Sequence, residues 1–164
     1  MQQYIYILLI PIYTFILSIS PNIYLEAEEK HLNNDVSVFL GATSNLDHDE
    51  TAFTLGVDYE YLLPFAERIF GIGVFGEVAF FDEEEYLIGF PLSLHLPHHF
   101  RLIAAPGIAI IDEDHGTEEE FLFRLAAGYA YELGNGFNVK TGIAVDFIDD
   151  EVSLVYGAAL GYEF

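Results

Sequence analysis

Residues 152–164, VSLVYGAALGYEF, carry an apolar side chain at every second position, and the side chains between are smaller or polar. Successive side chains of a β-strand point to opposite faces of a sheet, so this alternation predicts a strand with one apolar face. The positions on that face are Val152, Leu154, Tyr156, Ala158, Leu160, Tyr162 and Phe164.

The same period of two recurs seven more times from Asp35 onward, and no stretch there has the period of a helix. The apolar sets span 36–42, 53–61, 70–80, 86–96, 100–110, 121–133 and 137–147. Eight such strands predict an all-β fold, an eight-stranded antiparallel up-and-down β-barrel. Alternation alone leaves open whether the apolar face lines the core of a soluble barrel or sandwich, or faces lipid.

Aromatic side chains cluster at strand ends on the apolar face. They are Tyr59, Tyr61, Phe80, Tyr86, Phe100, Phe121, Phe123, Tyr129, Tyr131, Phe137, Phe147, Tyr162 and Phe164. Two aromatic bands around an aliphatic middle are typical of the interfacial belts of membrane barrels. A soluble core offers no reason for rings at both ends, so this pattern favours a transmembrane barrel.

The connections alternate in charge. Those after the first, third, fifth and seventh strands, NLDHDE, DEEE, DEDHGTEEE and DDE, hold 16 of the 27 acidic residues and no Lys or Arg. Those after the second, fourth and sixth, PFAER, PHH and GNG, hold one acid, Glu67. Odd connections of an up-and-down barrel share one end, so we predict acidic extracellular loops at one end and short, nearly neutral periplasmic turns at the other.

Three of the few cations, Arg101, Arg124 and Lys140, fall on the small, polar face of the strands. In a soluble protein they would be scattered in water, whereas in a membrane barrel they line the lumen, where a charge needs a partner. We therefore predict a lumen charge network of Asp58, Glu60, Glu77, Arg101, Arg124, Glu132, Lys140, Asp146 and Glu163.

Turn lengths predict which lumen residues meet. A three-residue turn at Gly134–Gly136 predicts the pairs Leu133–Phe137, Ala130–Lys140 and Arg124–Asp146, with Glu132 diagonal to Lys140. A three-residue turn at Pro97–His99 predicts the pairs Leu96–Phe100 and His95–Arg101, and His95 is expected to be neutral beside the arginine.

Two prolines, Pro91 and Pro106, fall almost opposite each other in the fourth and fifth strands. Each removes a backbone donor from the ladder, so we expect the seam between these strands to be open or bulged. The seam is either harmless strain or a lateral gap that admits a small apolar ligand or lipid tail.

The N-terminus is a separate segment. Residues 4–25, YIYILLIPIYTFILSISPNIYL, are almost wholly apolar or small. They predict a secretory signal peptide over residues 1–27, cleaved after Ala27, with a retained membrane helix as the alternative. A short lead over 28–34 then precedes a barrel over 35–164.

The composition excludes some functions. The chain of 164 residues has 27 Asp and Glu against 5 Lys and Arg, a net charge of −22, although 52% of its residues are hydrophobic. Nucleic-acid binding needs cations to neutralise phosphates, so it is not expected. The chain has no cysteine, which excludes disulfides, thiolate metal sites and cysteine nucleophiles.

The C-terminal pattern Tyr156, Leu160, Tyr162 and Phe164 resembles the signal that the outer-membrane assembly machinery reads. With the alternating strands, it makes residues 35–164 similar to the small eight-stranded outer-membrane barrels of Gram-negative bacteria. That group includes OmpA-type domains, OmpX/Ail-type surface proteins, OmpW-type barrels and lipid A-modifying enzymes. We expect a monomer in the outer membrane with both termini in the periplasm, and the resemblance names no subfamily.

Catalytic and metal candidates are few. Ser44, His48 and Asp49 form a Ser–His–acid grouping, and Ser93 shares the inward face with His95. Loop polarity and lumen packing account for both groups, so no catalytic residue and no cofactor are expected. Asp112, Asp114 and His115 are candidate ligands of a loosely held cation, without the spacing of a defined site.

Eight strands enclose a space that side chains fill, so no open channel is expected. The sequence favours a non-catalytic envelope or surface-interaction protein whose acidic end meets cations, host ligands, or lipopolysaccharide bridged by divalent cations. The alternatives are a transporter or narrow porin for small apolar or cationic solutes and, after it, a lipid A-modifying enzyme.

Overall fold

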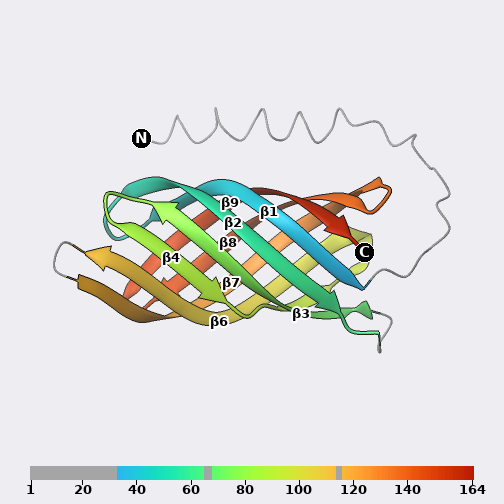
Figure 1. Ribbon diagram of the computed structural model, residues 1–164, viewed down its shortest axis with the longest axis horizontal. Coiled ribbons are helices and arrows are strands. Elements are labelled where there is room, and N and C mark those ends of the chain that lie inside the picture. The colour runs from blue at the N-terminus through green and yellow to red at the C-terminus, as the bar shows by residue number, and fades with distance from the viewer. Residues whose placement is uncertain (1–32, 65–67, 114–115) are drawn as a thin grey trace.

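One antiparallel sheet closes into a barrel (Figure 1). The computed structural model describes residues 33–64, 68–113 and 116–164, so the expected signal peptide and most of the lead lie outside the described residues. The strands are β1 (Asn34–Asn45), β2 (Glu50–Leu62), β3 (Phe70–Phe80), β4 (Glu84–Gly89), β5 (Leu92–His95), β6 (Phe100–Glu113), β7 (Gly116–Gly134), β8 (Phe137–Ile148) and β9 (Glu151–Glu163).

The barrel has eight strands because β4 and β5 are two parts of one strand. Both pair with β3 on one side and with β6 on the other. The last strand, β9, pairs with the first, β1, and closes the sheet. Residue pairs followed around the barrel from Asn34 return to β1 at Ser44, a stagger of ten residues. The predicted eight-stranded up-and-down barrel is confirmed.

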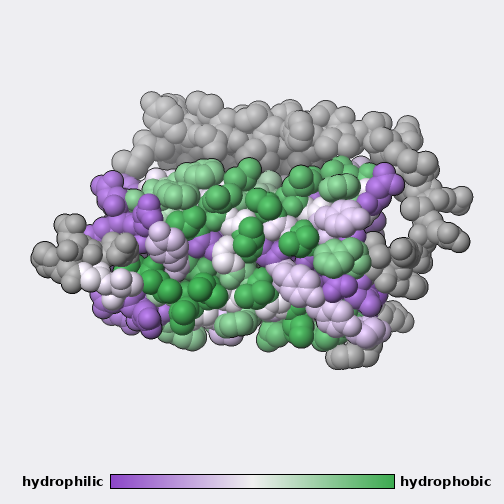
Figure 2. Space-filling model, viewed as in Figure 1, coloured by the Kyte–Doolittle hydropathy of each residue, from purple (hydrophilic) through white to green (hydrophobic). Residues whose placement is uncertain are grey.

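The apolar face of the strands points outward. Leu40, Leu160 and Phe90 are 54%, 55% and 60% exposed, whereas the inward Asp146 is completely buried. Figure 2 shows the apolar side chains as a belt between two polar ends. Because the closed ladder pairs backbone groups between strands, such a surface can face hydrocarbon. This is the architecture of a transmembrane β-barrel, and a soluble barrel has the reverse arrangement. No helix in the described ranges is long and apolar enough to cross a membrane.

Aromatic rings pack on the outer surface toward both ends of the barrel. At the end that carries the odd-numbered connections, Phe53 stacks on Phe80 with ring centroids 6.0 Å apart. At the other end, Phe137 lies 5.0 Å from Tyr162, on neighbouring strands. Since aromatic side chains favour the boundary between hydrocarbon and water, these contacts fit the two predicted belts.

The acidic connections are shorter than predicted, and many of their acids lie on strands. The β1–β2 turn is Leu46–Asp49, and the β8–β9 turn is only Asp149 and Asp150. The 19-residue β7 includes the run 118–120, EEE, which was predicted as loop. Strand pairing continues beyond the apolar belt because polar residues can pair in a ladder that water surrounds. The acids do gather at one end of the barrel, on strand ends and turns.

The predicted turn at Gly134–Gly136 is wrong in length, although most of its pairs are correct. Gly134, not Leu133, pairs with Phe137 around a two-residue turn, Asn135 and Gly136, which both have positive φ. A bulge between Glu132 and Gly134 adds one residue and restores the register. The predicted pairs Ala130–Lys140 and Arg124–Asp146 are therefore confirmed.

The fourth strand is interrupted at Phe90 and Pro91, but the seam with β6 is neither open nor bulged. The register is the same on both sides of the break. The Phe90 N–H donates to the Pro106 carbonyl over 2.9 Å, and the Pro91 carbonyl accepts from Gly73 N–H over 3.0 Å. Each proline removes one donor without displacing its strand, because the bonds on either side hold the register.

Candidate functional site in the barrel lumen

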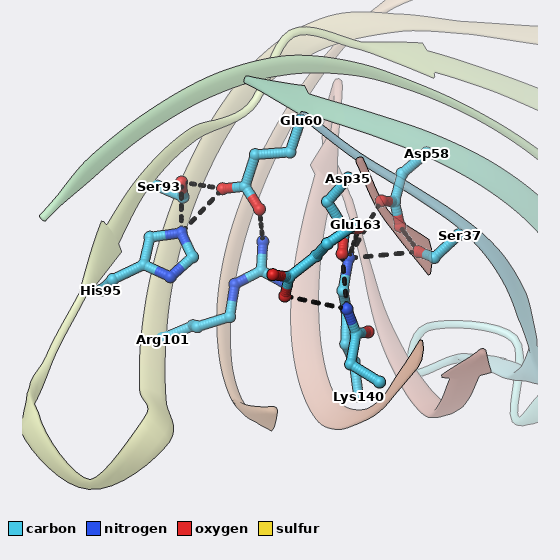
Figure 3. Close-up of polar contacts among 10 residues, drawn as sticks. Asp35, Ser37, Asp58, Glu60, Ser93, His95, Arg101, Lys140 and Glu163 are labelled. Carbon is cyan, nitrogen blue, oxygen red and sulfur yellow. Dashed lines mark hydrogen bonds and ion pairs between the residues drawn. The ribbon is translucent and has the colours of Figure 1, made fainter. Parts of the chain in front are cut away.

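The inward side chains form three clusters of charged groups. Within each cluster, hydrogen bonds join side chains from different strands across the lumen. Each inward position comes from the polar set of a strand with period two, so the strands aim these groups at one another. The clusters are the Arg124 cluster, the Glu60 cluster and the Lys140 cluster. The Glu60 and Lys140 clusters lie toward the end of the barrel where β1 begins and β9 ends (Figures 1 and 3).

The Arg124 cluster consists of Arg124 on β7, Asp146 on β8 and Glu77 on β3. Arg124 Nε and Nη2 donate to the Asp146 carboxylate over 2.6 and 2.7 Å. Nη1 and Nη2 donate to the Glu77 carboxylate, each over 2.7 Å. The guanidinium also lies 4.4 Å from the centre of the Phe75 ring. One cation therefore bridges two buried carboxylates and spans the barrel interior, with the planar geometry that arginine provides.

The Glu60 cluster consists of Glu60 on β2, Arg101 on β6, and Ser93 and His95 on β5 (Figure 3). Arg101 Nη2 donates to Glu60 Oε2 over 2.6 Å, and His95 Nε2 lies 2.9 Å from Glu60 Oε1. Ser93 donates to the same carboxylate. The predicted pair His95–Arg101 is confirmed in the register, and both side chains converge on Glu60.

The Lys140 cluster consists of Lys140 and Asn138 on β8, Asp35 and Ser37 on β1, Asp58 on β2 and Glu163 on β9 (Figure 3). Lys140 Nζ contacts Asp35 and lies 3.5 Å from Asp58 Oδ2. Asn138 donates to Asp35 over 2.6 Å and to Glu163 over 3.2 Å. The cluster ties together β8, β9, β1 and β2, the strands on both sides of the barrel closure.

Most residues of the predicted network meet in these clusters. Glu132 does not: it is exposed, and Lys140 pairs with Asp35 instead of with it. The prediction omitted Asp35, Ser37, Ser93 and Asn138. Inward alternation was a signal for Asp35 and Ser37, which face Glu163 and Gly161 across the closure. The prediction missed these residues because it derived pairs from turn lengths, and no turn connects the closing pair β1–β9.

The Ser93–His95–Glu60 contact is not a catalytic triad. His95 Nε2 lies 3.3 Å from Ser93 Oγ and also contacts Glu60, while Ser93 donates directly to Glu60. In a triad the two ring nitrogens have separate partners, the nucleophile and the acid. Here one nitrogen contacts both, so the carboxylate does not hold the opposite ring nitrogen while the histidine takes the serine proton.

The second Ser–His–acid grouping is not assembled either. Ser44 Oγ lies 2.9 Å from Thr51 Oγ1, and His48 Nε2 lies 2.9 Å from Glu151 Oε1. The proposed metal ligands Asp114, His115 and the Asp112 side chain lie outside the described residues. Within the described ranges, no group of three or more Asp, Glu or His side chains is placed to hold a metal ion.

At the acidic end, Glu151 fastens two turns together. Its carboxylate accepts from Asn45 Nδ2 over 2.7 Å and contacts His48. Asp47 accepts from the Val152 N–H over 2.8 Å, which adds a second link between the same turns. The hydrogen bond to Glu151, and then its charge, raise the pKa of His48 above the usual value near 6.5.

We predict that this His48–Glu151 link is pH-dependent. Because the pKa of His48 is raised in the folded chain, the link stabilises the fold fully below about pH 6.5, and its contribution is lost as the pH rises through the raised pKa. An NMR titration of His48 should show the raised pKa, and Glu151→Gln should return it toward the usual value. Asp150→Asn is the control and should change it less. An unchanged pKa in Glu151→Gln would contradict the link.

Comparison with known proteins supports the fold. No family model and no curated protein sequence matches this chain. Among solved structures, it is similar to Neisserial surface protein A (10% identity, TM-score 0.59, 81% of this chain and 97% of that one). It is also similar to the N-terminal barrel domain of Pseudomonas aeruginosa OprF (15%, 0.59, 81% and 99%). Ail, the attachment invasion locus protein of Yersinia pestis, follows (15%, 0.52, 81% and 99%).

The similarity therefore extends over nearly the whole of these small barrels and about four fifths of this chain. At such low identity it establishes the fold and not the activity. The chain has the fold of a small eight-stranded transmembrane β-barrel, as its alternating strands predicted.

Proposed function

We propose that the protein is an integral barrel of a bacterial outer membrane with a non-catalytic, surface-interaction role. Its acidic end faces outward and binds divalent cations, and through them lipopolysaccharide. The apolar belt and the fold neighbours support a membrane location. The nearly neutral end, with the strand ends nearest both termini, faces the periplasm. Tyr156, Leu160, Tyr162 and Phe164 of β9 serve the outer-membrane assembly machinery, and the barrel acts as a monomer.

The observation that carries this proposal is the separation of charge. Within the described residues, the cations of the barrel wall point into the lumen and are neutralised there, as Arg124 and Lys140 are. Four acids of the turns, Asp82, Glu83, Asp149 and Asp150, are all exposed. Anionic lipopolysaccharide beside such an end requires bridging cations.

Lipopolysaccharide binding in the presence and absence of calcium tests this role. We expect calcium to increase retention of the reconstituted barrel on lipopolysaccharide-containing vesicles, because it bridges carboxylates and phosphates. The variant Asp82→Asn, Glu83→Gln, Asp149→Asn, Asp150→Asn should lose that increase. Glu132→Gln, which removes an exposed acid at the opposite end, is the control and should keep it. A calcium effect that survives the fourfold variant would overturn the proposal.

A transporter is the second candidate, because Pro91 at the strand break also lines an internal cavity. Two observations weigh against a pore. The Arg124 cluster crosses the lumen, and the apolar side chains of Leu87 and Leu122 are fully buried beside it. Planar-bilayer recordings distinguish the two functions: the surface role predicts no steady channel, whereas stable cation-selective steps would favour the transporter.

A further inference from the structure

A cavity of about 150 Å³ lies inside the barrel between the charged clusters. Arg124 and Glu77 border it toward the acidic end, and Glu60, Arg101 and Lys140 border it toward the other end. The register supports this order along the axis. On β8, for example, the inward positions run from Lys140 through Gly142 and Ala144 to Asp146.

Two kinds of wall line the cavity. One is built of small side chains on adjacent strands: Ala126 and Gly128 on β7, Gly142 and Ala144 on β8, and Gly157 and Ala159 on β9. The other is built of Phe39, Phe75, Pro91 and Ile103. The space exists because small residues occupy three neighbouring strands at the level where large apolar side chains face them.

The surface exposed to the cavity is mostly carbon, although charged residues border it. Their polar atoms are largely occupied by one another: Arg124 makes four hydrogen bonds to carboxylates, and Glu60 contacts Arg101, His95 and Ser93. Asp58 is the most accessible charged group of the wall, with its side chain 29% exposed. Water needs two to four polar partners, and most of this wall offers none.

We propose that this cavity is a binding site for a small neutral aromatic molecule of about the size of benzene. A cavity of roughly 150 Å³ with a largely apolar surface is large enough for benzene. The site lies within the lumen between the Arg124 cluster on one side and the Glu60 and Lys140 clusters on the other. The Phe39 and Phe75 rings supply flat apolar walls. This site is separate from the acidic end of the barrel. An experiment that disproves binding in the cavity therefore leaves the proposed surface role untouched, and the reverse also holds.

Alanine methyl groups report on the site directly. Ala126 and Ala144 line the cavity. Ala42 and Ala158 lie on the outer face of β1 and β9, and neither borders the cavity. Ala109 is buried on the inward face but does not border the cavity. With methyl-labelled alanine in nanodiscs, benzene should give saturable shifts at Ala126 and Ala144. The methyls of Ala42 and Ala158 should show only the linear drift of benzene partitioning into lipid, and Ala109 should not respond.

Filling the cavity provides the decisive comparison. Ala144→Leu should abolish the saturable shifts at Ala126, whereas Ala158→Leu, the matched change on the outer face, should leave them intact. If Ala144→Leu does not fold, as judged by heat-modifiable gel migration, Ala126→Val read at Ala144 takes its place. Shifts at the cavity methyls that only follow the lipid-facing methyls, or that survive the filling variant, would overturn the proposal.

Discussion

Arg124→Ala is expected to lower the free energy of unfolding by about 3–5 kcal/mol, because it removes the cation that pairs the carboxylates of Asp146 and Glu77. Asp146 is fully buried, and the Glu77 side chain is only 9% exposed. The loss of four charge-assisted hydrogen bonds leaves both groups without a counter-charge. Urea unfolding in phospholipid vesicles, followed by heat-modifiable gel migration, measures the change.

A neutral version of the Arg124 cluster distinguishes two causes of destabilisation: carboxylates left without a counter-charge, and packing lost with the arginine side chain. Arg124→Met combined with Glu77→Gln and Asp146→Asn removes every charge and keeps most of the volume, so it should be less destabilising than Arg124→Ala alone. Glu119→Ala, an exposed position on the same strand, should have little effect. A change below about 1 kcal/mol for Arg124→Ala would show that the guanidinium does not bridge the carboxylates.

Ile143→Arg is expected to destabilise the barrel in a phospholipid bilayer by about 2–4 kcal/mol. Ile143 is 49% exposed on the outer face of β8, near the middle of the strand. An arginine there would place its charge in hydrocarbon at the depth where this cost is greatest. The same vesicle unfolding assay gives the measurement.

Asp150→Arg is the depth control for this prediction. Asp150 lies in the β8–β9 turn, beyond the apolar belt, so arginine there remains in water and its cost should be near zero. Equal effects at the two positions would mean that the face carrying Ile143 does not lie in hydrocarbon.

The sequence predicted the barrel and the outward direction of its apolar face because one physical constraint acts on every strand. A lipid-facing surface requires an apolar residue at each outward position, and VSLVYGAALGYEF shows this without interruption. The pair Arg124–Asp146 was predicted correctly although the turn was not. The real turn is one residue shorter than the assumed turn, and the bulge at Leu133 adds one residue to β7, so the two differences cancel.

The complete charge network was not predictable by the same counting. Turns relate neighbouring strands, but Asp35 reaches Lys140 and Asn138 across the closing pair β1–β9, where no turn sets the register. Glu77 meets Arg124 from the other side of the lumen, so strand pairing alone does not give the contact. Such contacts depend on the stagger of the whole barrel, which follows only when every pairing is known.

Strand length was also misjudged, and for a physical reason. The prediction ended strands where apolar alternation ended, as at the acidic run before Phe121. Backbone pairing does not need apolar side chains, however, and β6 and β7 remain paired as far as Glu113 and Gly116. Similarly, Pro91 and Pro106 suggested an open seam, but one proline on each strand leaves enough donors to hold the register.

The most direct test asks which side chains of β9 touch lipid. A nitroxide placed deep in the acyl chains broadens the methyl signals near it, and no mutation is needed. The methyls of Leu154, Ala158 and Leu160 should broaden strongly, while those of Val155 and Ala159, on the inward face, should be protected. Equal broadening of both sets, or stronger broadening at Val155 and Ala159, would contradict a membrane-spanning barrel with its polar face inside.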